Sequence, residues 1–134
     1  MFLTHSFKFH PSRLTASTLH YPSGVWSDGK LLIVGDAWNH RVLIWHSIPT
    51  ESGQPADVVV GQPDFNSNQP NVIGIGNDPS AKTLNWPYGI FSDGNSLWIA
   101  DTGNRRILFY NDIPKTNYVA ADKVIGKANF ETRD

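Results

Sequence analysis

Two stretches of the chain place short apolar runs on both sides of a polar turn, a pattern that predicts β-hairpins. In the later stretch, residues 97–100 and 107–110 flank the turn Asp101-Thr102-Gly103-Asn104. β-Branched and aromatic residues around a Gly/Asn turn are typical of paired antiparallel strands. Residues 31–45 carry the same pattern. Apolar and polar positions hardly alternate within these runs, which indicates strands that are covered on both faces.

The two hairpins belong to an internal repeat. Residues 19–65 align without a gap with residues 84–130, and 18 of the 47 pairs are identical. A gapless match of this length indicates two copies of one structural unit. The pattern in each copy predicts four strands. Asp-Gly is typical of a tight turn after the first strand, and Ile-Pro ends the third because proline cannot donate to a strand ladder. The predicted strands cover residues 24–27, 31–35, 41–46 and 57–60, and then 89–92, 96–100, 106–110 and 122–125.

Consecutive antiparallel strands with short turns, repeated, predict an all-β fold made of β-propeller blades of four strands, two blades in this chain. The long connection between the blades is rich in Asn, Pro and Gly, so we expect it to be mobile or functional. The N-terminal segment could be the remnant of a preceding repeat, since Phe2 stands about as far before the first blade as Phe65 does before the second. The predicted organisation is an N-terminal segment (1–18), blade 1 (19–65), a linker (66–83) and blade 2 (84–130).

The pattern within each blade resembles the NHL-repeat family of β-propellers, in the extended form found in bacterial members. It reads Pro-x-Gly-(Val/Ile), and then (Val/Ile)-x-Asp-x-x-Asn-x-Arg-(Val/Ile)-Leu-x-(Trp/Tyr). The chain carries this pattern twice. The matching residues are Pro22, Gly24, Asp36, Asn39, Arg41 and Val42, and then Pro87, Gly89, Asp101, Asn104, Arg106 and Ile107.

The resemblance implies a ring of about six blades, of which this chain supplies two. Two blades alone would leave large apolar sheet faces in water, which a soluble monomer avoids. We therefore expect either a homo-oligomer, most simply a trimer that completes six blades, or a chain that is part of a longer propeller. Closure of a ring from identical chains would make each contact between them heterologous.

Composition narrows the function without naming it. The formal net charge is −1, which gives no global attraction to nucleic acid or to anionic membranes. The chain has no cysteine, which excludes disulfides, thiolate zinc sites and cysteine nucleophiles. No apolar run approaches the roughly 20 residues of a membrane-spanning helix. The N-terminus has no apolar segment of signal-peptide type, which favours a cytoplasmic protein without a membrane partner.

The sequence assigns no catalytic residue, no metal site and no cofactor. Asp, Asn and Arg recur at the same place in both blades and suit turn hydrogen bonds and ion pairs, so we interpret them as structural. The histidines lack the spacing of metal ligands, although copies of His20 could meet near a symmetry axis. The structural residues are Asp36, Asn39, Arg41, Asp101, Asn104 and Arg106, and the histidines are His5, His10, His20, His40 and His46.

Positions that differ between the two blades are the candidate binding residues. Trp38 and His40 stand in the turn of the first blade where the second has Gly103 and Arg105. Protein interfaces are enriched in Trp, Tyr and Arg. The sequence therefore predicts a recognition face made of Tyr21, Trp38, His40, Trp86, Arg105 and Arg106.

The main hypothesis is a non-catalytic binding or scaffold module that recognises a protein or another macromolecule through this face. One alternative is a propeller enzyme, a metal-dependent lyase or hydrolase with its site at the central channel. Some NHL-like propellers are amidating lyases that hold metal through histidines, and their site cannot be matched here residue by residue. A second alternative is single-stranded RNA binding through stacking and cationic contacts, which the near-neutral charge disfavours.

Overall fold

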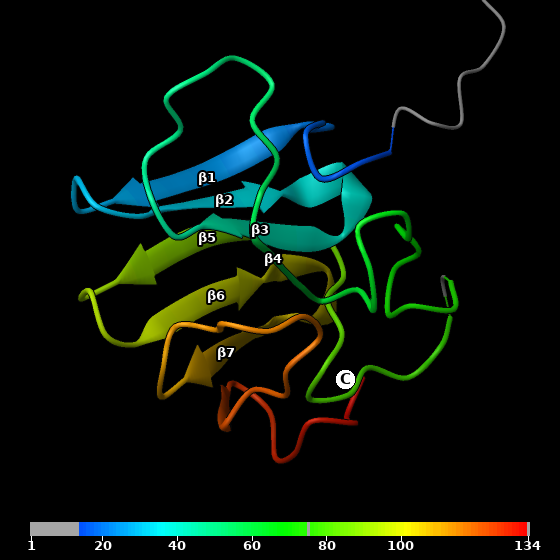
Figure 1. Cartoon of the computed structure of the whole chain (residues 1–134). Helices are drawn as coiled ribbons and strands as arrows, with labels where there is room; N and C mark the ends of the chain where they lie inside the picture. Colours follow the sequence, from blue (N-terminus) through cyan, green and yellow to red (C-terminus); the bar gives the residue numbers. More distant parts are fainter. Residues whose placement is uncertain (1–13, 75, 134) are drawn as a thin grey trace, which may run out of the picture.

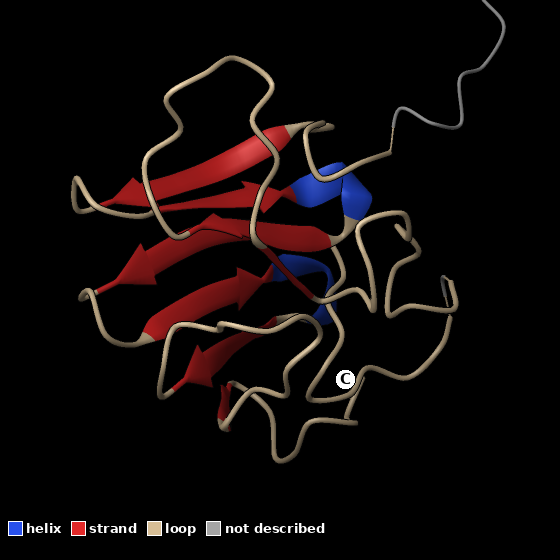
Figure 2. Cartoon of the chain, in the orientation of Figure 1, coloured by secondary structure: helices blue, strands red, loops and turns tan. Residues whose placement is uncertain are grey.

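The computed structural model of the chain describes residues 14–74 and 76–133 and contains two four-stranded antiparallel sheets (Figures 1 and 2). In each sheet the strands follow one another in chain order. The prediction of an all-β fold with two blade-like sheets is confirmed. The first sheet contains β1 (Pro22–Ser27), β2 (Leu32–Asp36), β3 (Arg41–Trp45) and β4 (Val58–Val60), and the second contains β5 (Pro87–Ser92), β6 (Leu97–Asp101), β7 (Arg106–Tyr110) and β8 (Lys123–Ile125).

The strands begin close to their predicted positions, with two systematic differences. β1 and β5 begin two residues early, at Pro22 and Pro87, which pair with the aspartates that end β2 and β6. An irregularity in register follows each proline, and a proline is tolerated at a strand start because no ladder bond from its nitrogen is needed there. The second and fourth strands begin one residue late, at Leu32 and Leu97 and at Val58 and Lys123.

Each hairpin turn is a single turn of 3-10 helix, η3 (Ala37–Asn39) and η4 (Thr102–Asn104), drawn in blue in Figure 2. A residue in the left-handed conformation follows each turn, His40 in the first repeat and Arg105 in the second. Positive φ angles recur throughout at equivalent positions, so the two repeats share their backbone path in detail. The other pairs are Tyr21 and Trp86, Gly29 and Gly94, Gly53 and Tyr118, and Gly61 and Gly126.

The main hydrophobic core lies between the two sheets. Its fully buried members come from both sheets, and β5 contacts both β1 and β2. Ser23 on β1 adds a polar contact, because its Oγ lies 3.1 Å from the carbonyl oxygens of both Pro87 and Tyr88. A smaller cluster lies on the opposite face of the first sheet. The main core includes Ile33, Val42, Ile44, Leu84, Leu97, Ile99 and Leu108, and the smaller cluster includes Val34, Leu43, Trp45 and Val59.

Leu84 closes the contact between the repeats next to Gly61. The Leu84 side chain is fully buried, and a Cβ atom placed on Gly61 would lie 2.5 Å from Leu84 Cδ1. Gly61 also has a φ angle of +93°, which disfavours a side chain. A leucine from the second repeat therefore fills a space that a glycine leaves open in the first.

The structural repeat extends upstream of the sequence alignment. The N–H of Ala56 donates to the carbonyl of Ala16, and the N–H of Ala121 donates to the carbonyl of Ala81, both at 2.8 Å. These two contacts are equivalent, so residues 14–18 pack on the first sheet in the same way as residues 79–83 pack on the second. Residues 1–13, which make up most of the predicted N-terminal segment, lie outside the described residues.

The linker between the repeats folds against both turns. Asn71 is buried and exchanges two side-chain hydrogen bonds with Asn104, at 2.8 and 3.1 Å. Gln62 donates from Nε2 to the carbonyls of His40 and Gln69. In the part of the chain that the structure describes, no helix is long and apolar enough to cross a membrane.

We expect Leu84→Ala to lower the free energy of unfolding by about 2–5 kcal/mol, because it empties a fully buried site between the repeats. Ile73→Ala is the matched control, since Ile73 is 72% exposed in the linker and its loss should change stability by less than about 0.5 kcal/mol. Urea denaturation followed by tryptophan fluorescence measures both values. Equal effects of the two substitutions would contradict the buried contact.

Candidate functional site

The shared polar residues form one buried network in each repeat. In the first repeat, Asp36 Oδ2 accepts hydrogen bonds from Arg41 Nε at 2.8 Å and from Asn39 Nδ2 at 2.9 Å. Asp36 Oδ1 accepts from the N–H of His20 at 2.6 Å. The Asp36 and Arg41 side chains are fully buried.

The arginine of each network reaches backbone carbonyls from two distant segments. Arg41 donates to the carbonyls of Thr15, Thr18 and Phe65 at 2.8–2.9 Å. The second repeat reproduces every one of these bonds, with Asp101, Asn104 and Arg106 in the same roles and Ser80, Thr83 and Phe130 as acceptors. Each arginine donates to backbone carbonyls that pack on its own sheet, so both arginines stabilise the fold of their repeat.

The sequence placed Arg106 both among the structural residues and on the recognition face, and its burial removes it from the recognition face. Its side chain is fully buried beside Asp101. The neighbouring Arg105 is exposed and lines a small polar pocket with Asn85, Asn71 and Arg133. Consecutive arginines thus have opposite environments, because the first ends the turn and the second begins β7.

The structure brings the predicted aromatic residues together at the starts of β1 and β5. Tyr21 and Trp38 stack, with ring centroids 5.3 Å apart and ring planes 14° apart. The ring centroid of Tyr88 lies 6.1 Å from that of Tyr21, and the ring centroid of Trp86 lies 5.5 Å from that of Tyr88. The four rings form a continuous row from Trp38 through Tyr21 and Tyr88 to Trp86, which we call the aromatic row.

Three of these side chains are exposed although they are large and partly apolar. Tyr21 is 51% exposed, Trp38 44% and Trp86 40%. Tyr21 and Trp86 occupy the same position in their repeats and have φ angles of 63° and 59°. A positive φ angle is uncommon for a bulky residue, and such conformations cluster at functional sites. Both repeats therefore hold an aromatic ring outward in the same uncommon backbone conformation.

His40 joins the aromatic row to the turn of the first repeat. Its Nδ1 accepts the N–H of Trp86 at 3.0 Å, which requires a ring that is unprotonated at this nitrogen. Burial lowers the pKa of His40, and the nearby Asp36 carboxylate opposes this shift only in part. The neutral imidazole thus fixes the backbone on which Trp86 stands.

Two residues of this surface, His20 beside the aromatic row and Tyr88 within it, were not predicted to belong to it. His20 packs against Trp38 with ring centroids 5.0 Å apart. Tyr88 corresponds to Ser23 in the first repeat, so it is another position at which the repeats differ, and a closer comparison of the two copies could have singled it out. Partial burial and the neighbouring Tyr21 hydroxyl both raise the pKa of Tyr88.

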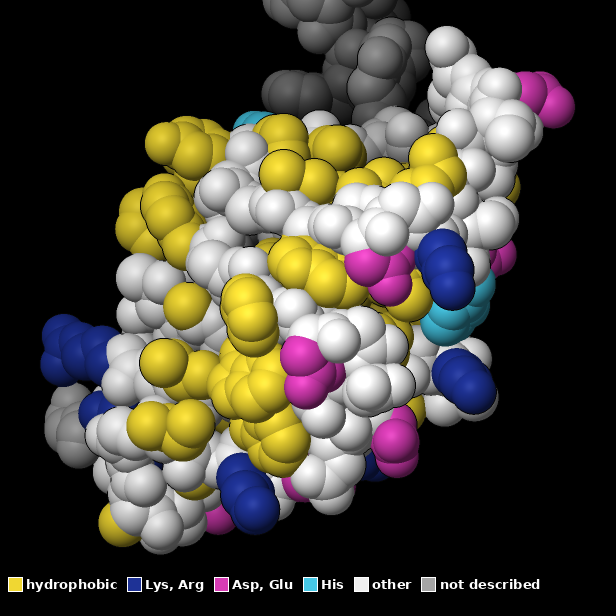
Figure 3. All heavy atoms as spheres, turned by 90° about the vertical axis from the view of Figure 1, so that its left-hand side faces the viewer, with side chains coloured by type: hydrophobic (Ala, Val, Ile, Leu, Met, Phe, Trp, Pro, Cys, Tyr) yellow, Lys and Arg dark blue, Asp and Glu magenta, His cyan; other side chains and the backbone are white. Residues whose placement is uncertain are grey.

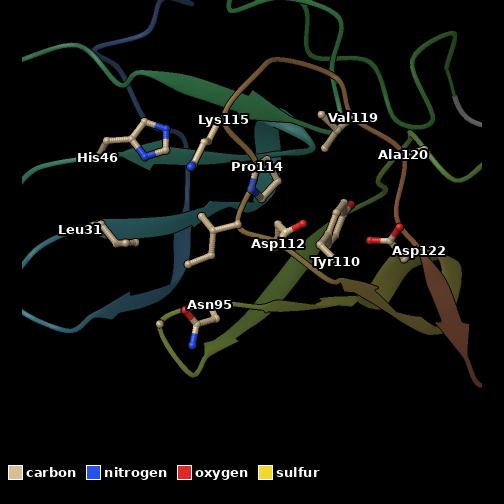
Figure 4. Close-up of a pocket in the computed structure, with 12 residues that line it drawn as sticks. Leu31, His46, Asn95, Tyr110, Asp112, Pro114, Lys115, Val119, Ala120 and Asp122 are labelled. Atoms are coloured by element: carbon tan, nitrogen blue, oxygen red, sulfur yellow. The ribbon is translucent and has the colours of Figure 1, made fainter.

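A larger pocket opens at the opposite end of the sheets, beside the turn that joins β5 and β6 (Figure 4). It has a volume of about 540 Å³, the size of a small-molecule site. Figure 3 shows this end of the molecule, where hydrophobic side chains gather at the centre with acidic and basic side chains around them. Charged and titratable residues on its wall are His46, Asp112, Lys115 and Asp122.

The hydroxyl of Tyr110 on this wall is buried and has no hydrogen-bond partner among the described residues. Burial raises its pKa, so it remains a neutral donor. The equivalent Trp45 donates from Nε1 to the carbonyl of Gln54 at 3.0 Å. The second repeat has therefore exchanged an internal bond for a hydroxyl that borders a pocket.

In residues 14–74 and 76–133, no group of three or more His, Asp or Glu side chains is arranged to hold a metal ion. His5 and His10 lie outside the described residues. No protein-family model matches the chain, and no curated protein sequence matches it.

We expect Asp101→Ala to lower the free energy of unfolding by about 3–5 kcal/mol, because it leaves the buried Arg106 without its carboxylate. Asp93→Ala is the control, since Asp93 is an exposed turn residue that accepts two backbone hydrogen bonds, and its loss should destabilise the protein clearly less than the loss of Asp101. Chemical denaturation separates the two. A smaller effect for Asp101→Ala than for Asp93→Ala would show that the network is not structural.

The lowered pKa of His40 makes stability depend on pH. Protonation is easier in the unfolded chain, so the contribution of neutral His40 is complete above the unfolded-state pKa of about 6.5 and is lost as the pH falls through the lower folded-state pKa. We expect His40→Asn, which tolerates the left-handed conformation, to lose less stability than wild type between about pH 7.5 and about pH 5.5. Urea midpoints at the two pH values measure this. Parallel losses in both proteins would show that His40 is not coupled to folding.

Proposed function

We propose that this chain is a non-catalytic binding module that recognises a protein partner through the aromatic row. The observation that carries the proposal is the exposed array of Trp38, Tyr21, Tyr88 and Trp86, two of whose members stand in a strained backbone conformation. Strain of this kind persists only where the surrounding structure over-determines it.

The chemistry of the aromatic row suits a protein surface. Tyr and Trp offer large contact areas with few rotatable bonds and a polar group at the edge, which makes them common anchors in interfaces. The rings already touch one another, so little side-chain freedom remains to be lost on binding. His20 adds a polar group beside Trp38, and the exposed Arg105 lines a polar pocket with Asn85, which directly precedes Trp86.

The resemblance to NHL repeats gives this surface a place in a larger assembly. In a propeller the first strand of each blade lines the central channel, and the aromatic row stands where β1 and β5 begin. A six-bladed ring made from three chains would carry three copies of the aromatic row around one mouth of the channel.

We do not favour RNA or a metal-dependent reaction as the main function. Burial of Arg106 in an ion pair removes one of the two arginines on which cationic RNA contacts would depend. The pocket beside Tyr110 is large enough for a small molecule, but its charged residues come from separate loops and none is hydrogen-bonded to another as an acid–base pair among the bonds of the described residues.

Selection of a displayed random-peptide library on the full chain tests the proposal directly. We expect the selected peptides to bind Trp38→Ala and Trp86→Ala at least about 30-fold more weakly than wild type, as for interface hot spots of about 2 kcal/mol. Ile73→Ala, which removes an exposed hydrophobic side chain that is not part of the aromatic row, should bind as wild type does. Fluorescence polarisation gives the affinities, and thermal melts monitored by circular dichroism confirm that each variant is folded.

Two outcomes would overturn this function. Peptides that bind Trp38→Ala and Trp86→Ala as tightly as wild type would remove the aromatic row as the recognition surface. Tight, salt-dependent binding of oligouridine that Arg105→Ala abolishes, or a stoichiometric metal in the purified protein, would favour the RNA or the enzyme hypothesis instead.

A further inference from the structure

Most exposed large hydrophobic residues outside the aromatic row occupy positions that are buried or packed into the core in the other repeat. Phe91, Ile107 and Ile125 of the second repeat are exposed, whereas their equivalents Trp26, Val42 and Val60 pack between the sheets. Leu19, Val25 and Ile48 of the first repeat are exposed, whereas their equivalents Leu84, Ile90 and Ile113 pack in the same core. The two sets therefore occupy positions equivalent to the two sides of the contact between the sheets. On the outer side of the first sheet the exposed part is formed by Leu19, Val25 and Ile48, whereas Val34, Leu43 and Val59 are already buried in the smaller cluster.

The side on the second repeat, which we call the head face, is a continuous apolar surface. The ring of Trp98 lies 5.5 Å from that of Phe91 and 4.9 Å from that of Phe109. An apolar groove of about 420 Å³ runs past Phe91, Trp98 and Ile107. In the first sheet, the surface equivalent to the head face is the one that contacts the second sheet inside the chain.

The side on the first repeat, which we call the tail face, carries the matching contacts. Leu84 is fully buried against Gly61, and its equivalent Leu19 is 45% exposed. Gly126, the equivalent of Gly61, has a similar positive φ angle, and among the described residues a Cβ atom placed there would meet only backbone atoms of Arg105 and Arg106 within 4 Å. The tail face thus presents a leucine, and the head face presents the open glycine into which such a leucine fits.

The outermost strands, β4 and β8, differ in the same way: a loop of the other repeat binds the free edge of β4, and in the part of the chain that the structure describes the edge of β8 is left without one. The loop between β7 and β8 reaches the free edge of β4, where Val59 donates to Asn117 Oδ1 and accepts from the N–H of Tyr118, both at 3.0 Å (Figure 1). The equivalent loop of the first repeat presents Ser52 and Gly53, and Gly53 shares the positive φ angle of Tyr118. The equivalent edge, at Val124 on β8, pairs with no such loop among the described residues.

The charges next to these two edges are complementary. Lys123 precedes Val124 on the head face, where the first repeat has Val58, and it stands over the ring of Phe109. Glu51 precedes Ser52 on the tail face, where the second repeat has Thr116. Inside the chain the corresponding residues, Val58 and Thr116, are uncharged. At the two free faces they are replaced by Lys123 and Glu51, whose opposite charges would fix the register of an approaching partner.

We propose that the head face is covered by the tail face of a second copy of this chain, in a heterologous contact that repeats the interface between the two sheets. The Leu19 side chain of one copy packs against Gly126 of its neighbour, and Ser52 and Gly53 bind the β8 edge at Val124. A single chain carries both sides but cannot join them to each other, so association continues from copy to copy until a ring closes. This contact does not depend on what the aromatic row binds.

Light scattering coupled to gel filtration tests the contact on the full chain. We expect wild type to elute as a whole multiple of 14.9 kDa, three copies if six blades close the ring. Phe91→Glu on the head face and Val25→Glu on the tail face should each weaken association by about 100-fold or more, because a carboxylate would be buried against an apolar surface. Ile73→Glu is the control, since it adds the same charge at an exposed hydrophobic position outside both faces.

Mixing the two variants distinguishes a heterologous contact from a symmetric one. Phe91→Glu keeps an intact tail face and Val25→Glu keeps an intact head face, so an equimolar mixture should form a complex of two chains and no larger species. A symmetric contact between two head faces would be abolished by Phe91→Glu alone, would be unaffected by Val25→Glu and would not be restored by mixing.

Both substituted side chains are exposed, Phe91 at 58% and Val25 at 69%, so the monomeric variants should retain the far-ultraviolet circular dichroism of wild type. A folded wild-type protein that remains monomeric at micromolar concentration would overturn the proposal and would assign both faces to other blades of a longer chain. A mixture of variants that stays monomeric while wild type assembles would also overturn it.

Discussion

Each repeat is organised around a buried ion pair between the aspartate that ends its second strand and the arginine that begins its third. Burying two charges is unfavourable unless their hydrogen-bonding groups are satisfied, and a pair left with unused donors destabilises a fold. Here the carboxylate accepts three hydrogen bonds and the guanidinium donates to three backbone carbonyls besides. Those acceptors belong to the segment before the first strand and to the end of the repeat, so one ion pair joins three parts of the chain.

The same ion pair determines how the variable residues are displayed. Asp36 and Asp101 hold the N–H groups of His20 and Asn85, which directly precede Tyr21 and Trp86. The chain must then turn through a left-handed residue to enter β1 or β5, and the side chain at that residue points away from the core. The shared framework thus explains why an aromatic residue at this position is exposed in both repeats, while Trp38 and Gly103 can differ without disturbing it.

The sequence was sufficient to predict what depends on local pattern. Turn dipeptides, strand-ending prolines and a gapless repeat located all eight strands to within two residues, and recurrence marked Asp36, Asn39 and Arg41 as framework. Recurrence also marked Arg106 as framework, but its burial could not be read locally, because it depends on carbonyls of Ser80 and Phe130, each more than twenty residues away. The contact between Asn71 and Asn104 has the same character, since composition predicts a loop but not where the loop folds back.

The asymmetry between the repeats connects assembly with recognition. Pairs such as Val42 and Ile107, or Leu84 and Leu19, are apolar in both copies, although only one member of each pair is buried within the chain. A surface meant to face water has no physical reason to keep this apolar character, and a repeated interface does. If copies join through these faces, each adds one aromatic row at a fixed spacing from the next. A partner with repeated binding segments would then gain affinity through effective concentration without any new contact, provided that its segments span the distance between rows.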